Sequence, residues 1–187
     1  MMMRGNMILR THRLTLVAAT REHVLAELTS RAALAALLAA EVPASWPPGE
    51  YDADALEYFR ARLTERPDTA GWYGWFILAD RPDEPAAWLV GGAGFLGPPG
   101  EDGTVEVGYS VIPEVQGRGY TTEAVRALID FASGSGGVKR VVAHTDATNA
   151  ASIAVLEKCG FAMVGAGTQA GTQRYERLIG APAATGR

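Results

Sequence analysis

Two glycine clusters in the chain have residue types and spacings that bind phosphate groups in proteins. In VGGAGFLG, residues 90–97, Gly92, Gly94 and Gly97 have the GxGxxG spacing that cradles the pyrophosphate of a dinucleotide. In PEVQGRGYTTEA, residues 113–124, a glycine-lined turn leads into a helical pattern, so unpaired backbone N–H groups could bind an anion. The segments around each cluster decide which of the two is a ligand site.

The segments that follow residues 90–97 argue against a dinucleotide. A dinucleotide fingerprint requires a helix that begins directly after the glycine turn. Here PPGEDG, residues 98–103, has two glycines that would end such a helix within a turn, and TVEVGYSVI, residues 104–112, has a strand pattern. We therefore interpret residues 90–97 as a glycine-rich strand with close backbone neighbours, and nicotinamide or flavin chemistry is not expected.

The second cluster lies between the predicted strand at residues 104–112 and a predicted helix. That helix has an apolar stripe on one face, formed by Ala124, Val125, Leu128, Ile129 and Ala132. Thr121 and Thr122 could cap its N-terminus with their hydroxyl groups. Glu123 makes the first turn acidic, and Arg118 adds a positive charge beside it. A tight strand-to-helix turn without a ligand is the alternative that this segment alone leaves open.

The order of the predicted elements differs from a regular alternation of strands and helices. Strands are predicted at residues 13–17, 74–80, 87–97, 104–112, 138–145, 161–165 and 173–179. A helix is predicted to begin at Arg21 with Thr20 as its N-cap, and a second helix continues through Leu34 and Leu38. Further helices are predicted at residues 54–66 and after Gly119. The last helix, residues 150–159, has Asn149 as its N-cap and ends at Gly160, which is expected to have a left-handed conformation. The apolar run Ala32–Ala40 is interpreted as a buried helix. This order predicts an α+β fold.

Length and charge predict one globular domain without a nucleic-acid ligand. The 187 residues suit a single domain with its core at about residues 8–179 and tails at 1–7 and 180–187. Hydrophobic residues make up 48% and charged residues 20%, values of an ordinary folded protein. The net charge of −4 and the lack of a basic run disfavour nucleic acid, because binding phosphates requires clustered Lys and Arg.

Other site classes and compartments are also disfavoured. The only cysteine, Cys159, excludes an internal disulfide and suits a reducing cytoplasm. The opening residues lack the apolar core of a secretory signal, and the run Ala32–Ala40 is too short to span a membrane. No metal site is expected, since His12, His23 and His144 have neither the spacing nor the neighbours of metal ligands.

The second cluster and a later segment together resemble a known family. GYSVIPEVQGRGYTTEAVRALIDFA, followed by VVAHTDATNAASIAVLEKCGF, resembles the GNAT superfamily of acetyl-CoA-dependent N-acetyltransferases, and most of all its branch of ribosomal-protein N-terminal alanine acetyltransferases. The motif match covers residues 106–161, about a third of the chain. The family signature [QR]xxGx[GA] is met by Gln116, Gly117, Arg118, Gly119 and Tyr120, with Thr121 where Gly or Ala is usual.

The resemblance implies a fold and a position for acetyl-CoA. The fold would be a single-domain, mixed and mainly antiparallel sheet with helices on both faces, splayed between strands 104–112 and 138–145. Acetyl-CoA would lie in that splay, its pantetheine arm pairing with the first of these strands. Its pyrophosphate would meet the N–H groups of Gln116, Gly117, Arg118, Gly119, Tyr120 and Thr121.

The implied chemistry is direct transfer of the acetyl group to an amine, which requires removal of an amine proton. The resemblance makes Glu106 the candidate base, acting directly or through water, with an exposed glutamate or a structural ion pair as the alternative. A main-chain N–H near Val111 would stabilise the oxyanion. In the NxxS motif, Asn149 would contact the pantetheine arm and Ser152 would protonate the thiolate, while a plain N-cap and an ordinary helix residue are the alternatives.

The acceptor is the least determined part of this hypothesis. The resemblance favours a primary amine, with a protein N-terminus as one candidate. A small-molecule amine (an amino acid, a polyamine or an antibiotic) and a non-catalytic acyl-CoA-binding sensor are the alternatives. Specificity is expected from residues 40–75, which include several aromatic residues, and the protein is expected to be a monomer or a homodimer.

Overall fold

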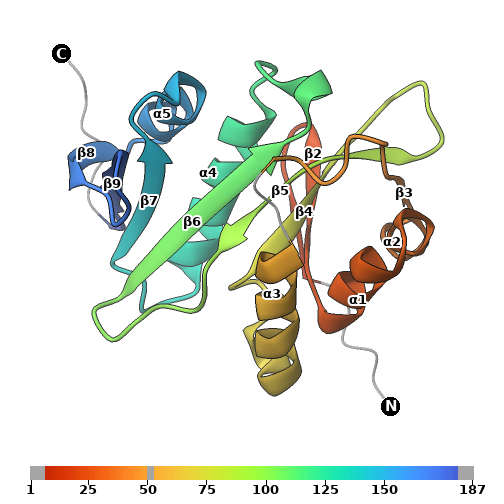
Figure 1. The fold of residues 1–187 in the computed structure, drawn as a ribbon, viewed down its shortest axis with the longest axis horizontal. Helices are drawn as coiled ribbons and strands as arrows, with labels where there is room; N and C mark the ends of the chain where they lie inside the picture. The colour runs from red at the N-terminus through yellow and green to blue at the C-terminus, as the bar shows by residue number, and fades with distance from the viewer. Residues whose placement is uncertain (1–6, 50–52, 181–187) are drawn as a thin grey trace.

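One sheet organises the part of the chain that the structure describes. The computed structural model describes residues 7–49 and 53–180, and its strands form one sheet in the order β1-β2-β4-β5-β6-β7-β9-β8, with β3 beside β5 (Figure 1). The strands are β1 (Ile8–Arg10), β2 (Leu14–Ala18), β3 (Ala40–Glu41), β4 (Gly74–Ala79), β5 (Ala87–Phe95), β6 (Thr104–Val111), β7 (Arg140–Asp146), β8 (Ala162–Ala166) and β9 (Thr172–Leu178). The helices are α1 (Arg21–Thr29), α2 (Arg31–Leu38), α3 (Ala53–Glu65), α4 (Tyr120–Gly134) and α5 (Ala150–Lys158), with short 3₁₀ turns at Pro67–Thr69 and Pro113–Val115.

The predicted fold class is confirmed. Neighbouring strands pair antiparallel except for β3 with β5 and β6 with β7, so the sheet is mixed and mainly antiparallel. Helix α4 lies on one face, while α1 and α3 lie on the other (Figure 1). Side chains of β4 alternate between these layers, because Trp75 contacts Phe131 of α4 and the next residue, Phe76, contacts His23 of α1.

Most local predictions agree with the structure, and the exceptions have simple causes. Thr20 caps α1, Asn149 caps α5, and Gly160 has a φ of +79°, as the sequence predicts. The strands β1 and β3 were not predicted, because runs of three and two residues are too short to show a period. The run Ala32–Ala40 is helical as predicted up to Leu38, but only one face of the helix is buried, through Leu34 and Leu38. Helix α2 ends at Leu38, where the chain turns into β3, and Leu37 is 42% exposed.

The predicted tails lie mostly outside the residues that the structure describes. Residues 1–6 and 181–187 are outside the described ranges, so only Met7 and Gly180 of the predicted tails are described. The core reaches from β1 to β9, and large buried side chains such as Trp75, Phe95 and Leu128 fill the layer between the sheet and α4.

The strands β6 and β7 separate part-way along their length. Their parallel pairing covers Thr104 to Glu106 on β6 and Arg140 to Val142 on β7, although β6 continues to Val111 and β7 to Asp146. Over the separated part, β6 remains paired with β5 on its other side, from Val107 to Val111. The splay between the two central strands is therefore present where the sequence predicts it.

The glycines of residues 90–97 allow strands to approach closely. A Cβ atom at Gly91 would lie 2.6 Å from the carbonyl oxygen of Ser110 on β6, and one at Gly94 would overlap the carbonyl oxygen of Tyr73. The segment is strand β5, and no helix follows Gly97. The prediction of a glycine-rich strand is confirmed.

We predict that Gly94→Ala destabilises the protein by about 1–3 kcal/mol, the usual cost of forcing extra atoms into a packed interior. The added methyl group would overlap backbone atoms of Tyr73, which cannot move away as a flexible side chain can. Urea unfolding measures the change. The matched control is Gly134→Ala at the end of α4, where a Cβ has open space. Equal stabilities of the two variants would contradict the close approach.

Candidate active site

A cleft of about 500 Å³ opens where β6 and β7 separate. It is bounded by the end of β6, by the turn before α4 together with the first turn of that helix, and by α5 along its length to Lys158. Of the predicted site residues, it brings together Val111, Gln116, Gly117, Gly119, Thr121, Asn149 and Ser152. Arg118, Tyr120 and Glu106 do not line it. The cleft thus joins segments that are more than thirty residues apart in the sequence.

The N-terminus of α4 presents unpaired N–H groups to this cleft. Its N-cap is Gly119, with a φ of +80°, and no side chain caps the helix. The prediction that Thr121 and Thr122 cap it is wrong, because both residues lie inside the first turn. Within the described part of the chain, the backbone N–H groups of residues 119–122 have no hydrogen-bond acceptor. Such groups at the positive end of a helix dipole bind anions, so this turn fits a pyrophosphate.

The edge of β6 also has free backbone groups in the splay. Leu96 N–H donates to the Glu106 carbonyl at 3.0 Å, and Ile112 N–H donates to the Val90 carbonyl at 2.9 Å. Because the direction of the backbone groups alternates along a strand, the even-numbered residues of β6 direct their N–H and C=O groups toward β5. The backbone N–H and C=O groups of Tyr109 and Val111 therefore point toward the β7 side, beyond the point where the pairing of β6 with β7 ends. An extended ligand with amide groups could pair with this edge as an added strand does.

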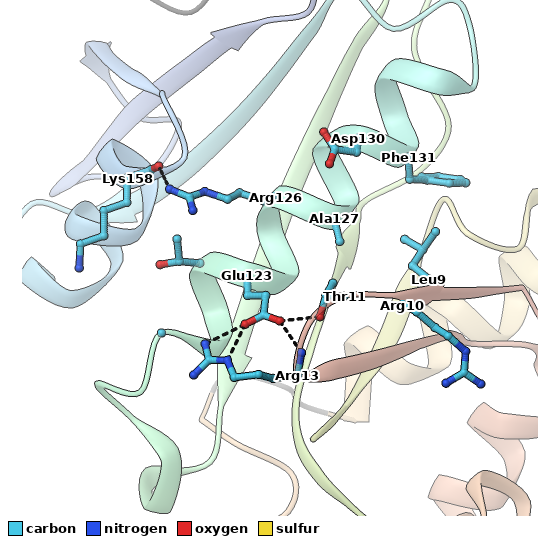
Figure 2. A pocket seen from close by; sticks show the side chains of 12 residues that line it. Leu9, Arg10, Thr11, Arg13, Glu123, Arg126, Ala127, Asp130, Phe131 and Lys158 are labelled. Atoms are coloured by element: carbon cyan, nitrogen blue, oxygen red, sulfur yellow. Dashed lines mark hydrogen bonds and ion pairs between the residues drawn. The ribbon is translucent and has the colours of Figure 1, made fainter. Parts of the chain in front are cut away.

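A clamp fixes the first turn of α4 to the β1–β2 turn, as Figure 2 shows. The Glu123 carboxylate accepts hydrogen bonds from the Thr11 hydroxyl at 2.6 Å, the Arg13 backbone N–H at 2.9 Å, and Arg13 Nε at 2.8 Å. The Arg13 guanidinium also donates to the Arg118 carbonyl at 3.1 Å and lies over the Tyr120 ring. Arg118 and Tyr120 thus help to hold the glycine turn in place.

The clamp also sets the ionisation of Glu123. Partial burial raises the pKa of this carboxyl group, but the hydrogen bonds from Thr11 and Arg13 and the charge of Arg13 outweigh that effect and hold the pKa below its ordinary value. Glu123 therefore stays charged at neutral pH. The clamp lines an open cavity of about 840 Å³ between β1 and α4.

Glu106 is paired with His144 across the two central strands. Glu106 Oε1 lies 2.9 Å from His144 Nδ1, and the side chains are 36% and 12% exposed, respectively. The other ring nitrogen, Nε2, is buried and has no partner among the described residues. When Nδ1 carries the proton and donates to Glu106, Nε2 is an acceptor. The pair therefore joins a carboxylate and an imidazole in one hydrogen-bonded unit.

From the sequence, His144 ends a predicted strand beside the splay, either as a structural residue or as one that assists proton transfer, and nothing there connects it with Glu106. The spacing gave no signal, because the two residues are 38 positions apart. Only the parallel register, in which Glu106 lies opposite Val142, brings His144 to the same face of the sheet two residues farther along.

Ser152 forms a second polar pair at the cleft, with Tyr109. The Tyr109 hydroxyl lies 3.0 Å from Ser152 Oγ and donates to the Ser152 carbonyl at 3.2 Å. Burial raises the pKa of Tyr109 to about 12, so the phenol is neutral. Asn149 Oδ1 accepts the Ser152 backbone N–H at 3.0 Å, which confirms the predicted N-cap. Sequence reasoning missed Tyr109, because no pattern links β6 to the start of α5.

The described residues do not provide a cysteine nucleophile, a metal site or a membrane-spanning helix. Cys159 is 1% exposed and burial raises the pKa of its thiol, so it is a poor nucleophile. In residues 7–49 and 53–180, no group of His, Cys, Asp and Glu side chains could hold a metal ion. None of the helices in these ranges is both long enough and apolar enough to cross a bilayer.

Comparison with known proteins identifies the family. Residues 13–162 match the family model described as an acetyltransferase (GNAT) domain. The chain belongs to the GNAT acetyltransferase family. A curated relative, the uncharacterized N-acetyltransferase YjdG of Bacillus subtilis (strain 168), is 35% identical over 121 residues, which cover 65% of this chain and 69% of YjdG. This GNAT protein is therefore an acetyl-CoA-dependent acyltransferase.

Solved structures share the GNAT fold. RimL, a ribosomal L7/L12 α-N-protein acetyltransferase in complex with coenzyme A, superposes with a TM-score of 0.66 at 19% identity and covers 92% of this chain and 98% of its own. MccE, a microcin C7 self-immunity acetyltransferase in complex with acetyl-CoA and AMP, has a TM-score of 0.60 at 20% identity over 90% of this chain and 94% of its own. The free N–H groups of α4 and the free edge of β6 fit the phosphates and the amides of acetyl-CoA, its co-substrate.

We predict that Gly119→Glu weakens acetyl-CoA binding at least tenfold, about 1.4 kcal/mol. The new carboxylate would lie at the free N–H groups of α4 and repel the pyrophosphate. Calorimetric titration with acetyl-CoA, and with NAD as a parallel ligand, measures the affinity. The control is Gly136→Glu, which makes the same change at a φ of +75° beyond the other end of α4. An unchanged affinity in Gly119→Glu would place the pyrophosphate elsewhere.

We predict that Glu123→Gln lowers the free energy of unfolding at pH 7 by about 1–2 kcal/mol, because the charged hydrogen bonds of the clamp are lost. The pKa of Glu123 is lower in the folded protein than in the unfolded chain. Its contribution to the free energy of unfolding is therefore complete above the ordinary glutamate pKa of about 4.3, and it is lost as the pH falls through the folded-state pKa. The difference between wild type and variant therefore shrinks below about pH 4. Urea unfolding across this range tests it, and a constant difference would contradict the clamp.

Proposed function

We propose that this GNAT protein acetylates the N-terminal amine of a protein or peptide, with Glu106 accepting the amine proton. The observation that carries the proposal is the Glu106–His144 pair, which lies beside the point where β6 and β7 separate. RimL, which has the same fold, acetylates a protein N-terminus and supports this acceptor class. The single cysteine suits the reducing cytoplasm as the place of the reaction.

The proposed reaction needs one proton removed and one delivered. The amine nitrogen forms a bond to the acetyl carbonyl carbon, and the bond between that carbon and sulfur breaks. Glu106 takes the amine proton, directly or through a water molecule, while the 2.9 Å hydrogen bond from His144 Nδ1 orients its carboxylate, and the proton then passes to solvent. The N–H of Val111, which points into the splay, donates to the developing oxyanion.

Ser152 is the proposed proton donor to the departing thiolate. Its hydroxyl lines the cleft and lies 3.0 Å from the Tyr109 hydroxyl, which holds it in place, and solvent water returns a proton to Ser152 after coenzyme A leaves. Tyr109 acts here as a positioning residue, because its hydroxyl also bonds the Ser152 carbonyl and so orients the first turn of α5. Asn149 keeps the same turn in register and presents its side chain to the pantetheine arm.

The acceptor test uses peptides that differ only in the state of the N-terminus. Release of coenzyme A is measured with a thiol reagent for one peptide with a free N-terminus and for the same peptide with a formylated N-terminus. Turnover only with the free peptide supports the proposal. Turnover with an amino acid, a polyamine or an aminoglycoside alone would assign a small-molecule acceptor, and binding of acetyl-CoA without any transfer would assign a sensor.

We predict that Glu106→Gln lowers kcat on an accepted peptide about 100-fold, the low end of the effect of removing a general base. The affinity for acetyl-CoA stays within about twofold, because Glu106 does not line the cleft. Steady-state rates and calorimetry measure the two quantities. Glu101→Gln, in the exposed turn before β6, is the matched control. An unchanged kcat in Glu106→Gln would remove Glu106 from the mechanism.

A further inference from the structure

A second cavity lies on the face of the sheet opposite to α4. It has a volume of about 270 Å³ and lies between α3 and the strands β4, β5 and β6. The described residues that line it are Ala55, Phe59, Gly74, Gly92, Ala93, Gly94, Phe95, Leu96, Gly108, Tyr109 and Ser110. Tyr109 and Ser110 also line the acetyl-CoA cleft, so the two cavities meet at β6.

The floor of this cavity is made by glycines on three adjacent strands. Gly74 lies opposite Gly94, and Gly94 lies opposite Gly108, so the three residues form a line across β4, β5 and β6. The space above Gly94 is occupied by the backbone of Tyr73, whereas a Cβ atom at Gly108 would have no neighbour within 4 Å. The missing side chain of Gly108 therefore leaves room on this face that no described residue fills.

The wall of the cavity is apolar. Phe59 of α3 packs against Tyr73 with ring centroids 5.8 Å apart, and Tyr58 donates to the Leu96 carbonyl at 3.4 Å, which fixes α3 over β5. Among the described lining residues, none has a charged side chain. An apolar cavity of about 150 Å³ is large enough for benzene, so this one accommodates an aliphatic or aromatic side chain.

The proposed base lies next to this cavity. Glu106 and Gly108 are two residues apart on β6, so their side-chain positions are on the same face and about 7 Å apart. Leu96, at the rim of the cavity, pairs with Glu106 through its N–H at 3.0 Å. An amine that reaches Glu106 therefore brings the group attached to its carbon toward Gly108.

We propose that this glycine-floored cavity binds the side chain of the acceptor's first residue and selects uncharged, apolar side chains. The inference rests on the proposed acetylation of N-terminal amines and names the class of N-terminus. A second ammonium group, as in a polyamine, or a charged first side chain would lose its hydration against Phe59 and Leu96. Among the described lining side chains it would gain only a neutral hydroxyl such as that of Ser110, and no opposite charge. An apolar side chain gains free energy from the same contact.

The test compares peptides that differ only in their first residue, Ala, Leu, Lys or Asp, together with spermidine. With the wild-type protein, we expect kcat/KM for Leu and Ala to exceed that for Lys, Asp and spermidine about tenfold or more, equivalent to 1.4 kcal/mol. Gly108→Val fills the open space above the floor. It should lower kcat/KM about tenfold for the Leu peptide and much less for the Ala peptide, as loss of room for one or two methylene groups does.

Two controls separate the cavity from the fold and from the cofactor. Gly134→Val makes the same change at an exposed position with open space and should leave the order of the peptides unchanged. Acetyl-CoA affinity by calorimetry should be equal in wild type and Gly108→Val, which also shows that the variant is folded. A rate loss that accompanies weaker acetyl-CoA binding would overturn the assignment of Gly108 to the acceptor.

The remaining outcomes distinguish this inference from the proposed function. If Lys peptides or spermidine are preferred, or if Gly108→Val lowers all rates equally, the apolar cavity is not the selective site, although acetyl transfer to amines stands. If no peptide is acetylated while acetyl-CoA binds, N-terminal acetylation itself fails, and the inference fails with it.

Discussion

The early end of the β6–β7 pairing is the constraint on which the rest of the molecule depends. Two neighbouring strands normally satisfy each other's backbone groups along their whole length, but here the pairing ends at Glu106 and Val142. The N–H groups of Tyr109 and Val111 do not pair with β7, and a cleft opens between the end of β6, the turn before α4 and α5. Pairing of β6 with β5 on its other side keeps this exposed edge rigid. The proposed acetyl-CoA site is therefore a preformed surface.

The phosphate end of the cleft depends on charge as well as on backbone geometry. Gly119 begins α4 without a side-chain cap, which leaves the N–H groups of the first turn free. An uncapped helix end is less stable by itself, and the Glu123 carboxylate offsets this by joining that turn to Thr11 and Arg13. The same arginine carries positive charge beside the turn and bonds the Arg118 carbonyl. One set of contacts thus stabilises the turn and places positive charge beside the proposed phosphate site.

The two faces of the sheet divide the work of the proposed reaction. On the α4 side, bulky residues such as Trp75, Phe95 and Phe131 form a close-packed layer that supports β5 and β6. On the α3 side, glycines replace side chains and leave a cavity that meets the cleft at β6. The GxGxxG spacing of residues 90–97 therefore serves strand packing and the proposed acceptor-side cavity, and it is not the turn of a dinucleotide site.

Local patterns in the sequence were enough to predict the order of the main elements, the Thr20 and Asn149 caps and the glycine turn before α4, because periodicity, capping and turn chemistry act over a few residues. The motifs also indicated the family. The short strands β1 and β3 and the absence of a threonine cap on α4 were not predicted. The polar pairs became visible in the folded chain alone: Glu106 with His144 across 38 residues, Tyr109 with Ser152 across 43, and Arg13 with Glu123 across 110. These pairs depend on the register and separation of strands, which are set by packing of the whole sheet and leave no local pattern.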